Sequence, residues 1–407
     1  MKLTPPLLKQ IARPFKKVWA RKYPSKPFNV ADIPEGLVKK GIGITDPFRT
    51  ERIVTQQLEP EVSDNTEQRP GYNVEPVWEF TDNNRFIEGL KQAQNLTKCV
   101  IYSGMPDGVF SLIDKVQHPQ QNELLKRLIL QSQVWDPAKE KLPKRIDKSC
   151  IKWKFNREYG IPTNRSIRIL NTNLIRLASS IIHLHYPASV TDTQLHIQPA
   201  LDAHYTYMGE QINIKTTPNF LLTGNHALPP FSDKVDNTAD EVLPDMFPVL
   251  PTIDLNSTHH YSLTNSIGFK NNTAFHPHTL ITGNCDLWRD EQRQARSMMF
   301  CLGYTIAQAQ LKYGEDVQIL PKPICIQSVS VGETGLNFVF FQLNTLDFSS
   351  KDGVKNQAWL DTGNSLYNKI LSQPWKGKEF TKHQYTDFVG TPFSKLLAVM
   401  QYGLQTS

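Results

Sequence analysis

Two adjacent apolar runs, residues 324–331 and 336–344, constrain the fold of this chain more than any other feature. Both are rich in β-branched and aromatic residues, and the Gly-Glu-Thr-Gly segment at 332–335 between them predicts a hairpin. Both faces of the second strand are apolar, so the strand is either central in a buried sheet or covered on one face by another chain. Because side chains alternate along a strand, its two faces carry Phe338 and Phe340, and Val339, Phe341 and Leu343.

A helix is predicted immediately before this hairpin, beginning near Glu291 and ending at Gly314, which stands where a C-cap is expected. Its apolar face follows helical spacing through Ala295, Met298, Met299, Leu302, Ile306 and Ala309. A terminal helix is predicted with Thr391 as its N-cap, Pro392 at the first helical position and Gly403 as its stop.

The upstream half mixes the two kinds of element without a steady βαβ alternation. Apolar spacing predicts helices over 84–97, 122–134 and 164–184, and short strands over 194–198, 204–208 and 211–215. Residues 232–248 are acidic and contain prolines, which indicates a loop or an internal boundary. We therefore predict a globular α+β body of mixed helices and short antiparallel sheets, with an extended basic N-terminal arm. The predicted regions are 1–76, 77–250 and 251–407.

Charge is divided unevenly along the chain. Residues 1–50 carry eleven lysines and arginines against three acids, whereas the remaining residues have a net charge of −2. An amphipathic start that is free of acids before Asp32 is typical of a mitochondrial import signal, and a basic RNA-binding tail is the alternative. The candidate RNA contacts here are Lys9, Arg13, Lys16, Lys17, Arg21, Lys22 and Lys26.

A second basic segment, residues 139–158, carries eight cations against three acids. Within it, Lys152-Trp153-Lys154-Phe155 alternates, so a strand would place both lysines on one face and both aromatics on the other. Such lysines could contact phosphates or simply protect a solvated strand edge. The candidate RNA contacts here are Lys144, Arg145, Lys148, Lys152 and Lys154.

One tripeptide, Asp361-Thr362-Gly363, resembles the aspartic peptidase signature. That chemistry needs two carboxylates that share one proton, and a single triplet supplies only one of them. A peptidase would therefore need a homodimer with Asp361 on its two-fold axis. The alternative is a turn after a short strand, in which Gly363 tolerates a positive φ.

Other catalytic and metal signatures are missing from the sequence. The chain lacks G-x-S-x-G, Walker and G-x-G-x-x-G motifs, and its paired histidines have no third ligand at a characteristic spacing. His183 and His185 fit the end of a helix, and His276-Pro277-His278 fits a proline-bounded loop. We therefore predict no catalytic residue, metal or cofactor, and no enzyme activity.

Cysteine usage and hydropathy also limit the cellular environments that suit this chain. The five cysteines are scattered and contain no C-x-x-C pair, which favours free thiols in a reducing environment. No apolar run reaches about 18 residues, so no membrane span is predicted.

Several runs resemble a known family, the mitochondrial large-subunit ribosomal protein thirty-seven family. They lie, in the same order as in that family, at Glu88–Ala93, Leu96–Lys98, Ser111–Asp114, Ala307–Gly314, Ile326–Val329, Phe341–Thr345 and Gly353–Asn356. The resemblance implies a non-catalytic structural constituent of the mitochondrial large ribosomal subunit in the matrix, acting in mitochondrial translation. It implies contacts with large-subunit rRNA and other large-subunit proteins, and pairing with a related paralogue, programmed cell death protein nine.

Two other functions remain open from the residues alone. One is an aspartic-type peptidase that uses Asp361. The other is a mitochondrial RNA-binding factor that visits ribosomes transiently.

Overall fold

The computed structural model describes residues 35–41, 76–133, 140–144, 146, 149, 151–152, 155, 157, 159–258, 265–269, 275–283, 288–314, 317–369 and 385–404. A first unit, Met1–Asp64, contributes one short described helix, α2 (Glu35–Val38). The second unit, Asn65–Ser407, is called the body below. The predicted import signal and the seven candidate cations of the arm lie outside the described residues.

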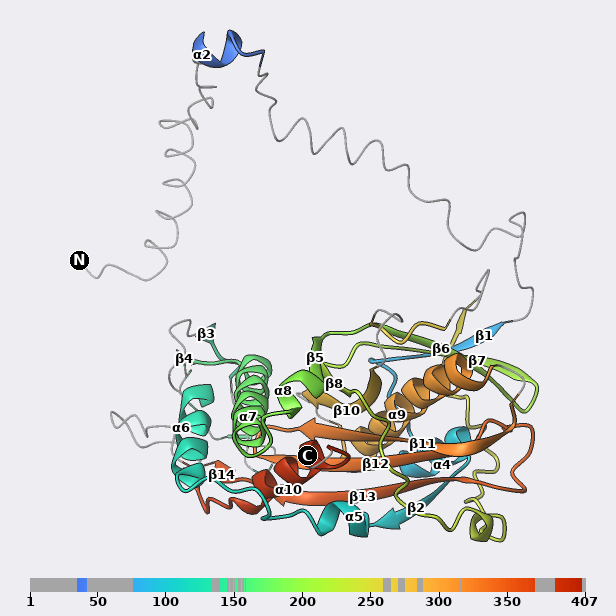
Figure 1. Cartoon of the computed structure of the whole chain (residues 1–407). Helices are drawn as coiled ribbons and strands as arrows, with labels where there is room; N and C mark the ends of the chain where they lie inside the picture. Colours follow the sequence, from blue (N-terminus) through green and yellow to red (C-terminus); the bar gives the residue numbers. More distant parts are fainter. Residues whose placement is uncertain are drawn as a thin grey trace. The chain divides into compact units, whose positions relative to one another are not determined.

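A seven-stranded mixed sheet forms the centre of the body (Figure 1). Its strands β11, β12 and β13 pair antiparallel, while β10 is parallel to β11 and β2 is parallel to β13. The strand order is β2 (Cys99–Ser103), β13 (Asn356–Ser365), β12 (Gly335–Thr345), β11 (Ile319–Val331), β10 (His276–Gly283), β8 (Phe220–Gly224) and β5 (Thr193–Ile197).

Helix α9 (Asp290–Tyr313) packs on one face of this sheet and also contacts a second, four-stranded sheet. The helix is therefore buried on nearly all sides, well beyond the single face that its periodicity predicts. Helix α4 (Leu90–Thr97) packs beside it. The four-stranded sheet has the order β6 (Leu201–Tyr207), β7 (Glu210–Thr216), β1 (Val77–Thr81) and β9 (Asn256–Thr258).

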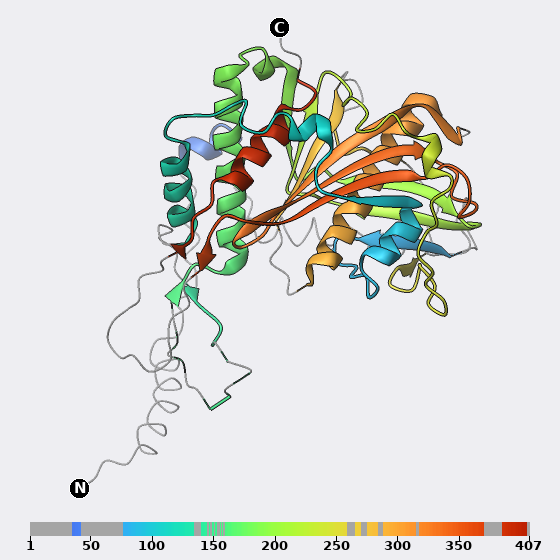
Figure 2. The same ribbon diagram turned by 90° about the horizontal axis from the view of Figure 1, so that it is seen from below.

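Helices cover the opposite face of the central sheet (Figure 2). The main ones are α6 (Gln121–Gln133), α7 (Thr163–His185) and α10 (Thr391–Gln401). The smaller elements are α5 (Asp107–Phe110), α8 (Ser189–Asp192), the 3-10 helix η1 (Asp236–Thr238), and the two-stranded pairs β3 (Glu140–Lys141) with β4 (Tyr159–Gly160) and β14 (Asn368–Lys369) with β15 (Tyr385–Thr386).

Strand β12 separates two hydrophobic cores. Phe338 and Phe340 lie in the core under α7 and α10, whereas Val339, Phe341 and Leu343 lie in the core with α9. All five side chains are buried, so the prediction of a central strand with opposed apolar faces is confirmed. The α+β class is confirmed as well. Strands from the predicted regions 77–250 and 251–407 pair within both sheets, and the boundary between these regions stays a prediction.

The helix predicted over 84–97 begins only at Leu90. Two local features prevent an earlier start: Gly89 has a left-handed φ of 57°, and the Asn84 side chain accepts hydrogen bonds from the backbone and hydroxyl of Thr81. An Asn that binds nearby backbone in this way favours a turn over a helix.

Two predicted ends shift by one residue. Gly390, not Thr391, is the N-cap of α10. The β6–β7 turn is formed by Met208 and Gly209 rather than Gly209 and Glu210, and both turn residues have positive φ values, as tight hairpins require.

Candidate functional site

Asp361 lies within strand β13 and not in a turn after it, so the predicted turn is wrong. The register between β12 and β13 shifts next to this position, and Gly363 has a φ of 76°. This irregularity leaves the strand extended through Ser365 while relaxing its pairing locally. The glycine therefore serves a bulge-like irregularity rather than the end of the strand.

The Asp361 carboxylate is bound by an ammonium group. Its Oδ2 accepts a hydrogen bond of 2.6 Å from Lys395 Nζ of α10 and one of 3.2 Å from Asn364 Nδ2. Lys395 Nζ also donates to Asn364 Oδ1 at 2.7 Å. This geometry joins β13 to α10 through an ion pair, in contrast to the proton-sharing carboxylate pair of an aspartic peptidase.

The two histidines of the 276–278 run lie on a strand, which corrects the predicted loop. Pro277 falls at a register shift between β10 and β8, a position where the missing backbone N–H of proline is tolerated. His278 is buried, donates from Nε2 to the Tyr402 carbonyl at 2.7 Å and lies 2.7 Å from Thr279 Oγ1 through Nδ1. Burial lowers the pKa of His278 to about 4, so the ring is a neutral structural link at physiological pH.

The remaining metal-type side chains have structural surroundings. His183 and His185 lie in the last turn of α7, as predicted, and His185 Nε2 lies 3.1 Å from the Gln117 carbonyl. Cys99, Cys301 and Cys325 are buried free thiols, and burial raises the pKa of Cys325 to about 12. Among the described residues, no group of three or more His, Cys, Asp or Glu side chains could hold a metal ion.

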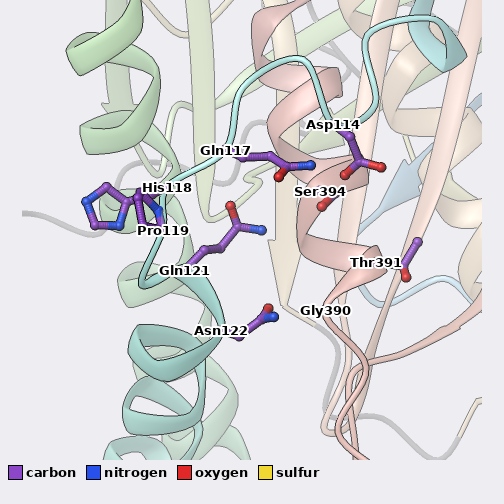
Figure 3. A pocket seen from close by; sticks show the side chains of 9 residues that line it. All are labelled: Asp114, Gln117, His118, Pro119, Gln121, Asn122, Gly390, Thr391 and Ser394. Carbon is purple, nitrogen blue, oxygen red and sulfur yellow. The ribbon is translucent and has the colours of Figure 1, made fainter.

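A polar pocket of about 520 Å³ lies between the first turns of α6 and α10 (Figure 3). No sequence motif marks its residues as one site, because they come from two distant segments. Gln121 is buried there, and its Oε1 has no hydrogen-bond partner in the described part of the chain. Such a pocket can hydrogen-bond a polar group. Its lining is Asp114, Gln117, His118, Pro119, Gln121, Asn122, Gly390, Thr391 and Ser394.

The second basic segment lies in the connection between α6 and α7, in which β3 pairs with β4 (Figure 1). Lys144 and Lys152 are exposed there, whereas Phe155 is buried. Lys152 lies in a turn and Phe155 in no regular element, so the alternating strand considered for 152–155 does not include these two residues. Arg145, Lys148 and Lys154 lie outside the described residues.

None of the helices in the described part of the chain combines the length and the apolar composition of a membrane span. Comparison with family models finds no match. Comparison with curated proteins, in contrast, finds relatives. The chain is 30% identical over 348 residues to large ribosomal subunit protein mL37 of Rattus norvegicus, which covers 83% of this chain and 77% of that protein.

The chain belongs to the mL37 family. The mL37 protein of Gallus gallus is 31% identical over 335 residues, covering 78% of this chain and 72% of that protein. The mL37 protein of Bos taurus is 28% identical over 349 residues, covering 83% and 78%. Membership of the mL37 family confirms the predicted resemblance and the predicted mitochondrial location.

Proposed function

We propose that this chain is a non-catalytic structural constituent of the mitochondrial large ribosomal subunit. The observation that carries the proposal is its identity of about 30% with mL37 proteins over some four fifths of the chain. The internal geometry is consistent with a structural role, because Asp361 forms an ion pair with Lys395 and His278 donates a hydrogen bond to a backbone carbonyl. A scaffold needs such fixed internal links and no group poised for proton transfer.

Sedimentation tests this proposal against the transient-factor alternative. A tagged chain expressed in mitochondria should migrate with the large subunit in gradients at low salt and remain there at high salt. A visiting factor held mainly by phosphate contacts should instead leave the subunit as the salt concentration rises. Release of the tagged chain under conditions that retain other large-subunit proteins would therefore contradict a structural role.

We further propose that the chain contacts rRNA through lysines and arginines of the arm and of segment 139–158. Lys144 and Lys152 are exposed and lie in a connection that carries eight cations against three acids. Phosphate contacts release counterions, and each one therefore steepens the dependence of affinity on salt. The proposed contacts are Lys9, Arg13, Lys16, Lys17, Arg21, Lys22, Lys26, Lys144, Arg145, Lys148, Lys152 and Lys154.

The double variant Lys144→Ala/Lys152→Ala tests the second group directly. Binding of the purified chain to large-subunit rRNA should weaken, and the slope of log affinity against log salt should fall by about one for each lost contact. Lys91→Ala/Lys322→Ala is a matched control, because both lysines are exposed but lie in α4 and β11. Equal slopes for the two double variants would remove Lys144 and Lys152 from the rRNA surface.

Pairing with the paralogue, programmed cell death protein nine, is also part of the proposal. Both faces of β12 and most of α9 are buried within the body, so pairing would use another surface. Mixing the two purified proteins and measuring mass by analytical ultracentrifugation should give a one-to-one complex. Two unshifted species at micromolar concentrations would reject direct pairing.

A further inference from the structure

A loop of the body turns several large apolar side chains outward. Residues 241–254, called the apolar loop here, lie in the connection between β8 and β9 (yellow-green in Figure 1). Four of its side chains are exposed: Val242 by 90%, Phe247 by 88%, Leu250 by 69% and Ile253 by 55%. Isolated exposed apolar residues are common, but four within twelve residues of one loop indicate an interaction surface.

Polar side chains of the body hold this loop in one conformation. Gln92 Nε2 donates to the Pro251 carbonyl at 2.8 Å, and Asn95 Nδ2 donates to the Pro244 carbonyl at 3.0 Å. Asn84 Nδ2 donates to the Asp254 carbonyl at 2.6 Å. Gln92 and Asn95 are buried on α4, so they fix the loop backbone to the body along its length.

Inward side chains anchor the same loop. Leu243, Met246 and Thr252 are buried, and they are interspersed along the chain with the exposed apolar residues. One side of the loop is therefore buried against the body. The exposed apolar side chains do not contribute to this packing. A preorganised apolar surface of this kind binds a partner at a low conformational cost.

The charge around the apolar loop selects the class of partner. Residues 233–254 contain six acids and one lysine, a net charge of −5. Asp233, Asp236, Asp240, Glu241 and Asp245 are exposed. Lys351 interacts with Asp245, whose pKa is lowered chiefly by a hydrogen bond from the Phe247 backbone N–H. Like charges repel, so this surface disfavours an RNA phosphate backbone and favours a cationic protein.

We propose that the apolar loop docks into an apolar pocket with a basic rim on a neighbouring protein of the large subunit. This inference rests on the proposed function, which places the chain in the large subunit. It adds the class of the partner and the residues that dock. Phe247 and Leu250 insert into the pocket, and the exposed acids of residues 233–245 face cations on its rim. This surface is separate from the basic segment 139–158, whose positive charge instead favours contact with RNA.

A photo-cross-linker tests the partner class in assembled subunits. Phe247 is replaced by p-benzoylphenylalanine in the full chain, and purified large subunits are irradiated and analysed by peptide mass spectrometry. The expected product links residue 247 to one protein segment of net positive charge. A link to rRNA, to an acidic segment or to residues 1–64 of this chain, or the absence of any light-dependent link, would overturn the proposal. Phe110, an exposed aromatic on α5, is the matched control position.

A second measurement separates docking from folding. Phe247→Ser/Leu250→Ser should leave the melting temperature of the isolated chain unchanged, because both side chains are exposed. It should reduce incorporation into large subunits about tenfold in competition with the wild-type chain, the scale expected for a binding hot spot. Phe110→Ser should incorporate at the wild-type level. Normal incorporation of the double variant would refute the docking role, whereas failure of the wild-type chain to enter subunits would refute the proposed function instead.

Discussion

The Asp361 carboxylate of β13 accepts a hydrogen bond of 2.6 Å from the Lys395 ammonium of α10, and both side chains are largely shielded from solvent. Helix α10 packs in the core that contains Phe338 and Phe340 of β12. The ion pair therefore links the terminal helix to β13 beside this apolar packing. In the folded chain, the carboxylate of the motif that resembles a peptidase signature is thus paired with an ammonium group.

Changing Asp361 to Asn should lower the free energy of unfolding by about 1–2 kcal/mol, because the substitution leaves Lys395 without its opposite charge. Urea unfolding measures this loss. In the Lys395→Met background, Asp361→Asn should lower the free energy of unfolding by clearly less, since the ion pair is already broken. Equal costs in the two backgrounds would show that the ion pair does not couple the two elements, and peptidase activity that disappears in Asp361→Asn would overturn the structural role.

Stability should fall as the pH drops from 6.5 toward 4, because His278 has a lowered pKa in the folded state. An unfolded histidine titrates near 6.5, so the unfolded state binds the proton first. The stabilisation is complete above that pH, and about 2 kcal/mol of it is lost by pH 5. Urea unfolding at pH 7.5 and pH 5 should show a smaller pH effect in His278→Gln than in the wild type. His226→Gln, a change at an exposed histidine, serves as the control, and an unchanged pH effect in His278→Gln would contradict this assignment.

Adding a methyl group at Gly303 should destabilise the body by about 1–3 kcal/mol, although alanine is the better helix former. A Cβ at this position would lie 2.6 Å from Leu201 Cδ2 and 2.9 Å from Ile214 Cγ2, where α9 closely approaches the four-stranded sheet. Leu311→Ala, on the exposed end of the same helix, should change stability by less than about 0.5 kcal/mol. Thermal unfolding of both variants measures this contrast, and a more stable Gly303→Ala would show that the two layers can separate without penalty.

Phe340→Asp and Phe341→Asp should each prevent stable folding, since each places a carboxylate in one of the two cores that β12 divides. A buried carboxyl without a partner must be held charged in an apolar core or kept protonated, and either cost is large against the narrow margin of stability of a domain. Circular dichroism and protease resistance check this expectation. A folded Phe340→Asp or Phe341→Asp chain that had lost only a binding partner would mean that one face of β12 is an interface.

Much of the local structure follows from periodicity. The spacing around Met298 and Gly314 predicts α9, the alternation from Phe338 to Leu343 predicts β12, and the glycines at 332 and 335 predict their hairpin. These signals are strong because each depends on neighbouring residues alone. The helix at 84–97 is the instructive failure. Its apolar spacing continues upstream of Leu90, but the backbone of Gly89 and the side chain of Asn84 form a turn there instead.

Fewer of the candidate site residues than of the helices and strands could be predicted from the sequence. Lys144 and Lys152 could be chosen from local charge, and the structure describes both as exposed. The polar pocket joins Gln121 to Ser394, and the apolar loop depends on Gln92 and Asn95, which are about 150 residues away from the carbonyls that they bind. No local pattern specifies such pairings, because they arise only when distant segments pack.

The sequence by itself determined helix α9, the hairpin of β11 and β12, the apolar faces of β12 and the resemblance to mL37 proteins, since these depend on residue identity and spacing. Only the tertiary structure decided that α9 is buried between two sheets, that Asp361 is neutralised by Lys395, and that Phe247 points to solvent. Each of these outcomes depends on which distant surfaces meet. The free energy of burial is gained over the whole contact area, so it fixes an arrangement that no single segment encodes.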